Sequence, residues 1–308
     1  MPSPAVEDGF KIAVLLPCRN VAGTIGAAVA GFAEALPAAR IYVFDNNSTD
    51  DTAREAARAG AHVLREPSAG KESVVRRMFA DIDADIYVMA DGDGSYDPAD
   101  APSLVNALIT ERVDMVVGNR RDVAPASRPG ASGAVARLNR LLLGAAVGDS
   151  RSGYRAFSRR FVKSFPAIPI GFDIDTEMSV HARQLMIPVA EIDLNFRRNA
   201  ESSTKPQKNA PPGSIVLARL LREMQPFPFY AAFALLFWIA GLLLAAPLVA
   251  TWIEAGRVAQ PGTAIVAMGL FLIGFMLAGC GLILDSVGRS RIEQKRILFL
   301  SVPALGSQ

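Results

Sequence analysis

The sequence Asp91-Gly92-Asp93 places two carboxylates one residue apart, directly after the apolar run 86–90. A short apolar run of this kind predicts a buried strand, so both carboxylates are expected at a strand end. Two carboxylates there can bind a hard divalent cation such as Mg²⁺ or Mn²⁺ from one side and leave its other positions to diphosphate oxygens. An isolated Asp-x-Asp pattern is equally compatible with a solvated turn, so the neighbouring clusters decide its meaning.

Other polar clusters follow predicted strands in the same way. Residues 17–20 follow the run 12–16, and residues 45–50 follow the run 41–44. Ligands of open α/β sheets bind at the carboxyl ends of the strands, so these clusters and Asp91 are expected to line one cleft. Gly70-Lys71 opens a predicted helix, where backbone amides and an ammonium suit a diphosphate. The alternative is that Lys71 is only a first-turn surface lysine.

The elements that must position these clusters alternate short strands with longer Ala-rich helices. Strands are predicted at 12–16, 41–44, 62–64, 86–90, 115–117 and 189–196, and helices at 24–36, 51–59, 71–81 and 99–110. This order is typical of an α/β fold with a mostly parallel sheet and flanking helices. The sheet domain is expected to span residues 1–206.

Two segments near the C-terminus, 229–253 and 263–284, carry no charged residue. Each exceeds the roughly 20 residues needed to cross a hydrocarbon core, so they predict a transmembrane hairpin spanning 229–285. The alternative is a pair of buried core helices. The segment 286–308 that follows is a basic tail, whereas the connector holds only Arg257, offset by Glu254. By the positive-inside rule both ends of the hairpin face the cytoplasm.

Residues 207–228, just before the hairpin, carry apolar side chains at near-helical spacing together with Arg219 and Arg222. This pattern predicts an amphipathic juxtamembrane helix lying on the membrane surface. The segment 197–222 is also predominantly basic, which suits anionic headgroups or an anionic lipid substrate. The alternative is a solvated basic linker.

Composition excludes several classes of protein. The chain of 308 residues has 32 Lys and Arg against 30 Asp and Glu, so no overall basic surface for nucleic acid is expected. Cys18 and Cys280 cannot form a disulfide framework, and with His62 and His181 they show no zinc-site spacing. Both histidines are expected to be structural, and a reducing cytosolic compartment fits.

Three motifs, taken in their order along the chain, resemble family 2 glycosyltransferases of the GT-A (Rossmann-like) fold. The first two strings, 14–20 and 44–52, precede Asp91-Gly92-Asp93, and the segments 149–155 and 198–205 resemble the polyprenyl-phosphate glycosyltransferase branch, which includes the dolichyl-phosphate mannose synthases. The similarity covers residues 10–206. The paired apolar segments resemble those of bacterial members of that branch.

The resemblance implies roles on the side of the nucleotide-sugar donor. Pro17 and Asn20 shape the loop under the nucleotide, while Asp45 and Asn47 bind it. Lys71 contacts the diphosphate. The donor-binding and catalytic residues Asp91 and Asp93 hold Mg²⁺ or Mn²⁺, with Ser95 as a further metal contact. The family often has a second Asp where this chain has Asn46, so the base contact there differs.

On the acceptor side, the resemblance implies that arginines hold a lipid phosphate. Arg120 and Arg198 are the leading ligands, each able to grip two oxygens, and Ser202 and Lys205 add to them. Asp149 is expected to order the acceptor loop or its arginines, and it is also counted with the catalytic residues. Asp175 or Glu177 is expected to face the sugar, and Asp175 is counted with the catalytic residues.

The expected function is inverting transfer of one hexose or N-acetylhexosamine from a nucleotide sugar to polyprenyl phosphate, with UDP-sugars favoured and GDP-mannose second. The protein is expected in the inner membrane, with the catalytic domain and both termini in the cytoplasm. Association into a homo-oligomer through the spans is left open. The alternatives are a membrane glycosyltransferase with a saccharide or glycolipid acceptor, and a non-catalytic scaffold that senses nucleotide sugars.

Overall fold

The computed structural model describes residues 9–120, 152–166, 173–194, 226–256 and 260–306. The chain divides into two compact units. The first comprises Met1–Ala210 together with Lys295–Gln308, and the second comprises Pro211–Gln294.

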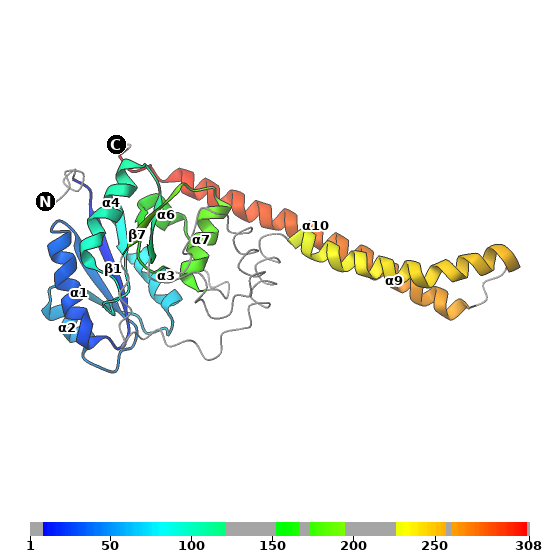
Figure 1. Ribbon diagram of the computed structural model, residues 1–308, viewed down its shortest axis with the longest axis horizontal. Helices are drawn as coiled ribbons and strands as arrows, with labels where there is room; N and C mark the ends of the chain where they lie inside the picture. The colour runs from blue at the N-terminus through cyan, green and yellow to red at the C-terminus, as the bar shows by residue number, and fades with distance from the viewer. Residues whose placement is uncertain (1–8, 121–151, 167–172, 195–225, 257–259, 307–308) are drawn as a thin grey trace. The chain divides into compact units, whose positions relative to one another are not determined.

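The first unit is built on a seven-stranded sheet with the order β3-β2-β1-β4-β6-β5-β7 (Figure 1). Its strands are β1 (Ile12–Cys18), β2 (Arg40–Asp45), β3 (His62–Arg65), β4 (Ile86–Met89), β5 (Met115–Arg120), β6 (Arg155–Ser158) and β7 (Val189–Leu194). Strands β1 to β4 pair in parallel, as do β5 and β7, whereas β6 runs antiparallel to both β4 and β5. This arrangement confirms the predicted mostly parallel sheet.

The sequence analysis predicts every strand of this sheet except β6. Strand β6 reads Arg-Ala-Phe-Ser, which lacks an apolar run, yet all four residues are buried. Its buried Arg155 donates from Nε to the Ser152 carbonyl at 2.8 Å and from Nη1 to Ser179 Oγ at 3.0 Å. The hydrophobicity pattern cannot reveal such a strand, because the buried arginine is accommodated by hydrogen bonds to residues elsewhere in the fold.

Helices cover both faces of the sheet. The helices are α1 (Ala22–Ala35), α2 (Thr52–Arg58), α3 (Lys71–Asp81), α4 (Ala101–Thr110), α6 (Arg159–Ser164) and α7 (Ile174–Gln184), with a 3₁₀ turn, η2 (Pro98–Asp100), before α4. Helices α1, α2 and α4 pack together, and α3 packs with α6 and α7. Along β1, Val14 and Leu16 join the core cluster under α1 and α4, while the intervening Leu15 is equally buried. Burial on both faces explains why the central strands read as continuous apolar runs.

His181 lies inside this core, on α7. Its Nε2 is 3.1 Å from Ser164 Oγ, and its ring packs edge-on against Phe161 and Phe165. Burial, together with the positive charge of Lys295, lowers the pKa of His181 to about 3. The imidazole is therefore neutral at physiological pH and has the structural role that the sequence analysis expects.

Replacing His181 with Leu should make the stability of the domain less sensitive to acid. Between pH 7.5 and 5 the unfolded chain protonates this imidazole at its ordinary pKa of about 6.5, whereas the native imidazole stays neutral until about pH 3. The native state should lose about 2 kcal/mol at this group over that interval. Thermal unfolding midpoints at both pH values should fall more for the unmodified protein than for His181→Leu. If the unfolding midpoint fell equally in both proteins, burial of neutral His181 would not contribute to the acid sensitivity of the domain.

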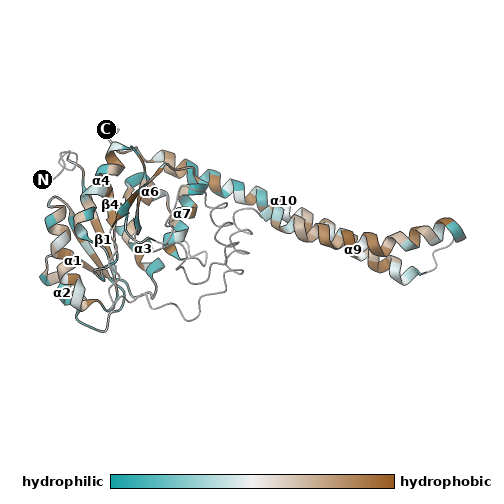
Figure 2. Ribbon diagram, in the orientation of Figure 1, coloured by the Kyte–Doolittle hydropathy of each residue, from teal (hydrophilic) through white to brown (hydrophobic). Residues whose placement is uncertain are grey.

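The second unit holds most of two long helices, α9 (Pro226–Ala255) and α10 (Pro261–Ser301). Both are long and apolar enough to cross a membrane, as judged by length and composition. Figure 2 shows hydrophobic residues along α9 and along much of α10, with polar residues gathering toward the C-terminal part of α10. Large apolar side chains such as Leu236 and Leu243 are exposed, at 64% and 71%, which suits helices surrounded by lipid.

The two helices pack against each other in antiparallel fashion. A Cβ placed on Gly241 would meet Phe271, and one placed on Gly281 would meet Tyr230, so residue numbers rise along one helix as they fall along the other. Gly274 leaves room for the indole of Trp238, which a Cβ there would approach to 2.4 Å. Small residues at such an interface are typical of helices that pack in a membrane. The predicted second span ends at residue 284, whereas helix α10 continues without a break to Ser301.

Candidate functional site

The carboxyl ends of three neighbouring strands bring the predicted donor-side clusters together. Strand β1 lies between β2 and β4, with Cys18 opposite Asp45 and Leu15 opposite Met89. The loops that begin at residues 19, 46 and 90 therefore leave the same edge of the sheet. Of the predicted site residues here, Pro17 lies within β1 itself, opposite Phe44 of β2.

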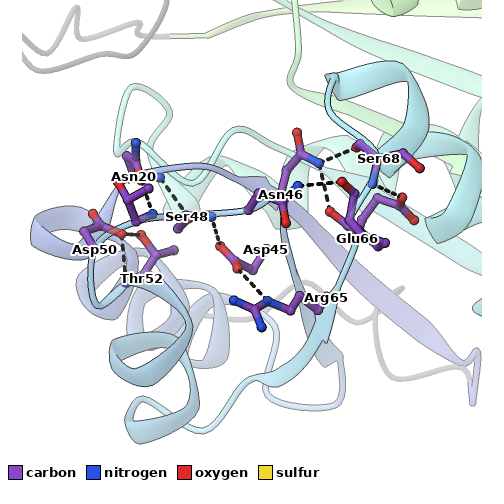
Figure 3. A network of polar contacts seen from close by, with 12 residues as sticks. Asn20, Asp45, Asn46, Ser48, Asp50, Thr52, Arg65, Glu66 and Ser68 are labelled. Atoms are coloured by element: carbon purple, nitrogen blue, oxygen red, sulfur yellow. Dashed lines mark hydrogen bonds and ion pairs between the residues drawn. The ribbon is translucent and has the colours of Figure 1, made fainter.

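Asn20 ties the loop after β1 to the loop after β2 (Figure 3). Its backbone N–H donates to Ser48 Oγ at 3.0 Å, and its side-chain Oδ1 accepts from the Thr49 N–H at 2.8 Å. Asn20 adopts a left-handed conformation with φ of 53°, which Asn tolerates better than most residues. Asn20 therefore holds these two loops together, and its expected place under a nucleotide stays a prediction.

Asp45 is the last residue of β2, and its carboxylate is buried at the carboxyl-end edge of the sheet. The residue is 2% exposed, and its Oδ1 accepts from the Ser48 N–H at 3.3 Å. Its Oδ2 lies 3.9 Å from Nε of Arg65, whose side chain is 75% exposed, so the charge of this pair is partly screened. The carboxylate is thus fixed in place from two sides (Figure 3).

Asn46 and Asn47 build the loop that leads into α3. Asn46 donates from Nδ2 to the carbonyls of Glu66 and Ser68, at 3.0 and 2.6 Å, and accepts from the Gly70 N–H at 3.0 Å. Asn47 donates from Nδ2 to the Pro67 carbonyl at 2.5 Å. A carboxylate at position 46 has no N–H to donate, which gives a physical reason for Asn where the family often has Asp. The sequence analysis notes the departure but misses this role.

Asn46→Asp should loosen the loop 66–70 and its Gly70-Lys71 junction. The new carboxylate would face two carbonyl oxygens, and loss of those hydrogen bonds in a buried position costs about 2 to 3 kcal/mol. Hydrogen exchange measured by mass spectrometry should be faster at residues 66–71, and Asn106→Asp on helix α4 serves as a control with the same chemical change. Unchanged exchange in Asn46→Asp would show that its side chain does not hold the loop.

Lys71 joins two carboxylates that come from different parts of the chain. Its Nζ is 3.0 Å from Asp91 Oδ1, just after β4, and 3.0 Å from Asp175 Oδ2 in the first turn of α7. Burial by itself would lower the pKa of Lys71, but the carboxylates of Asp175, Asp91 and Asp173 outweigh it and raise that pKa well above its ordinary value. Lys71 is therefore a charged member of the site, and the surface-lysine alternative is wrong.

Asp175 is the most enclosed member of this cluster, with a side chain only 5% exposed. Burial raises the pKa of Asp175, and the ammonium of Lys71 opposes that rise. Its second oxygen, Oδ1, is buried and accepts no hydrogen bond from any part of the chain that the structure describes. The site thus contains an oriented carboxylate with one oxygen committed to Lys71 and one still available.

Asp93 and Ser95 follow Asp91 in the same loop after β4, and both are buried. Asp93 Oδ1 accepts from the Ser95 N–H at 3.0 Å, while Ser95 Oγ has no hydrogen-bond partner among the described residues. Two carboxylates and an uncommitted hydroxyl are hard oxygen donors, which fit Mg²⁺ or Mn²⁺. The described residues contain no group of three or more His, Cys, Asp or Glu that could enclose a metal. A cation bound by Asp91 and Asp93 would need further oxygen ligands to complete its coordination.

Gly153 makes the close approach of the chain to Asp91 possible. A Cβ at this position would lie 2.8 Å from Asp91 Oδ2 and 3.2 Å from Lys71 Nζ. The Gly153 N–H donates to the Tyr96 hydroxyl at 2.9 Å, which fixes the backbone there. The sequence analysis does not identify this role, because nothing local shows that residue 153 packs against residue 91.

Gly153→Ala should displace the Asp91 carboxylate from Lys71. The rate of the expected sugar transfer should then fall by about tenfold or more, since misplacement of a site by 1 Å can cost 10²-fold. Gly26→Ala on α1 is the matched control, because a Cβ there meets nothing within 4 Å. Initial rates of nucleoside diphosphate release report the effect. An unchanged rate in Gly153→Ala would contradict the requirement for close backbone approach.

Several predicted acceptor-side residues cannot be placed. Asp149, Arg198, Ser202 and Lys205 lie outside the described residues, as does most of the predicted juxtamembrane helix. For Arg120, the structure describes the backbone at the end of β5 but not the side chain. Their roles stay predictions.

Comparison with known proteins identifies the class to which this site belongs. Residues 13–160 match the family model Glycosyl transferase family 2, a range that runs from β1 through β6. Protein RfbJ of Shigella flexneri is 53% identical over 113 residues, covering 37% of this chain and 88% of the relative. The chain belongs to glycosyl transferase family 2.

Two further relatives extend the comparison. Glycosyltransferase AglJ of Haloferax volcanii is 29% identical over 314 residues, covering 96% of this chain and 99% of its own length. The undecaprenyl-phosphate mannosyltransferase of Micrococcus luteus is 25% identical over 205 residues, covering 61% of this chain and 84% of its own length.

Among solved structures, the chain is similar to glucosyl-3-phosphoglycerate synthase from Mycobacterium tuberculosis in complex with Mg²⁺ and UDP. The TM-score is 0.58 at 25% identity, over 71% of this chain and 81% of that structure. The same enzyme with Mn²⁺, UDP and glucosyl-3-phosphoglycerate gives a TM-score of 0.53 at 26% identity, over 71% and 82%. These neighbours confirm the GT-A fold.

Proposed function

We propose that this glycosyltransferase moves a single hexose or N-acetylhexosamine, with inversion, from a nucleotide sugar to polyprenyl phosphate. UDP-sugars are the first choice of donor, and GDP-mannose is the second. The observation that carries the proposal is the combination in one chain of the Lys71 cluster at the sheet edge with two helices long enough to cross a membrane. If the acceptor is a lipid, membrane-spanning helices would keep the nucleotide-sugar site near the membrane that contains that acceptor.

The donor half of the reaction uses the edge formed by β1, β2 and β4. In this proposal Asp45 and Asn47 bind the nucleoside, next to Pro17 near the end of β1 and beside the loop that Asn20 holds. Lys71 places its ammonium against the diphosphate. Asp91 and Asp93, with Ser95 beside them, would hold Mg²⁺ or Mn²⁺, which supplies neutralising charge for the departing nucleoside diphosphate when bound.

The transfer itself is a displacement at the anomeric carbon. A phosphate oxygen of the acceptor forms the new bond to that carbon as the bond to the donor diphosphate breaks on the opposite face, and the nucleoside diphosphate leaves with the electron pair. The acceptor phosphate is already anionic near neutral pH, so alignment and charge compensation contribute more than proton removal. Asp175 keeps Lys71 oriented. In this proposal its Oδ1, which has no hydrogen-bond partner among the described residues, faces the sugar when the donor is bound.

The acceptor half of the proposal relies on the basic residues near the lipid. Arg120, Arg198, Ser202 and Lys205 hold the acceptor phosphate, and Asp149 orders the loop around them. The name of the Micrococcus luteus relative supports this choice, because that protein uses undecaprenyl phosphate. We place residues 1–206 and both termini in the cytoplasm, with the hairpin 229–285 in the inner membrane, on the basis of the charges that flank it.

The test incubates the full-length protein in detergent with labelled UDP-glucose, UDP-N-acetylglucosamine or GDP-mannose and with Mg²⁺ or Mn²⁺. Polyprenyl phosphate, 3-phosphoglycerate and a glycolipid are offered as acceptors in parallel. We expect label in a polyprenyl-phosphate product. Label only in 3-phosphoglycerate or only in glycolipid would overturn the lipid-phosphate acceptor, and no label with any acceptor would favour the non-catalytic scaffold.

Asp93→Asn should lower transfer at least about 100-fold, because it removes a charged ligand while it keeps the shape of the side chain. Asp83→Asn is the control, since that carboxylate is 60% exposed and paired with Arg159 away from the site. Both variants should keep the thermal unfolding midpoint of the unmodified protein within a few degrees. Full activity in Asp93→Asn would exclude Asp93 from the catalytic machinery.

A further inference from the structure

The last residues of the chain, Lys295–Gln308, belong to the same compact unit as the sheet, although the whole second unit, Pro211–Gln294, separates them from the rest of it in sequence. We call residues 295–306 the C-terminal clamp. Four consecutive apolar residues in it differ sharply in exposure: Phe299 is 3% exposed, whereas Ile297, Leu298 and Leu300 are 68%, 49% and 64% exposed. One ring is therefore inserted into the domain. Leu305, further on, packs against the core of the sheet.

The ring of Phe299 rests on an arginine that the domain holds in position. The Arg160 guanidinium carbon is 4.7 Å from the centre of that ring. Arg160, on α6, binds both carboxylate oxygens of Asp114, which is 1% exposed and also accepts from Ser158 Oγ at 2.7 Å. A guanidinium fixed by a buried carboxylate presents its flat face as a ready platform for an aromatic ring.

The same clamp binds the C-terminal end of helix α7. Arg296 Nη1 donates to the carbonyl of Leu185, the C-cap residue, at 2.5 Å, and Lys295 Nζ donates to Gln184 Oε1 at 3.2 Å. The last carbonyls of a helix lack partners within the helix, and positive charge is favourable there. Arg296 also lies 5.4 Å from the Phe299 ring, so the two contacts support each other.

Helix α7 is thus tied at both ends. Its first turn carries Asp175, which pairs with Lys71, and its last residues are held by the clamp. We propose that the C-terminal clamp is a working part of the transferase domain, in which Phe299 and Arg296 are positioning residues that hold α7 so that Asp175 stays against Lys71. The catalytic consequence rests on the proposed function, whereas the structural one does not.

This inference gives the end of α10 a role of its own. Helix α10 is continuous from Pro261 to Ser301, so an apolar helix and the clamp are parts of one element. Within the first unit, the last turns of that element contact α7 through Arg296 and α6 through Phe299. A basic tail that only followed the membrane would need neither the buried ring nor the bond to a helix cap.

The test compares Phe299→Ala with Leu298→Ala in the full-length protein in detergent. Leu298 is the matched control, as the adjacent apolar residue with an exposed side chain. In Phe299→Ala we expect hydrogen exchange of the α7 amides about tenfold faster, as loss of a partly desolvated cation–π contact implies. We also expect kcat to fall at least about threefold while KM for the nucleotide sugar is unchanged. Phe299→Trp, which keeps an aromatic face over Arg160, should restore both.

Equal exchange of α7 in Phe299→Ala and Leu298→Ala would overturn the proposal, and so would faster exchange without a fall in kcat. If Phe299→Ala does not fold, Arg296→Met provides the same readouts, because that side chain lies nearer the surface. If the unmodified protein shows no transfer at all, the proposed function fails separately. The exchange rates of α7 then still decide whether the clamp holds that helix.

Discussion

Three parts of the chain that are remote in sequence meet at the ammonium group of Lys71. The carboxylate of Asp91 comes from the end of β4 and that of Asp175 from the first turn of α7, and each lies 3.0 Å from the same Nζ. Two carboxylates that are both this close to one atom repel each other, and the Lys71 ammonium between them compensates for that repulsion. The shape of the site therefore depends on that one positive charge.

The surrounding structure serves to hold the three partners of this contact. Asn46 fixes the loop that delivers Lys71, through Gly70, and Gly153 leaves room beside Asp91. Buried Arg155 joins β6 to α7 through Ser179, whose hydroxyl donates to the Asp175 carbonyl at 3.1 Å. These contacts are made within the domain itself, so they preorganise the site before a substrate binds.

Much of the donor side can be predicted from the sequence, because each cluster there follows an apolar strand. The positions of Asn20, Asp45 and Asp91 at one edge follow from the rule that parallel strands end together. The pairing of Lys71 with Asp175 cannot be predicted in this way, because the residues are 104 positions apart and no local pattern joins them. The sequence analysis misses strand β6 for a related reason, since its sequence includes an arginine and a serine although all four of its residues are buried.

A double-mutant cycle of Lys71→Met and Asp175→Asn tests the central claim most directly. The measured quantity is kcat/KM for sugar transfer in the unmodified protein, the two single variants and the double variant. If the ammonium and the carboxylate act as one unit, the double variant should be about as impaired as Lys71→Met alone, with a coupling energy of at least about 1.4 kcal/mol. Losses that simply add, within about 0.5 kcal/mol, would show that the two residues act independently and would contradict this account.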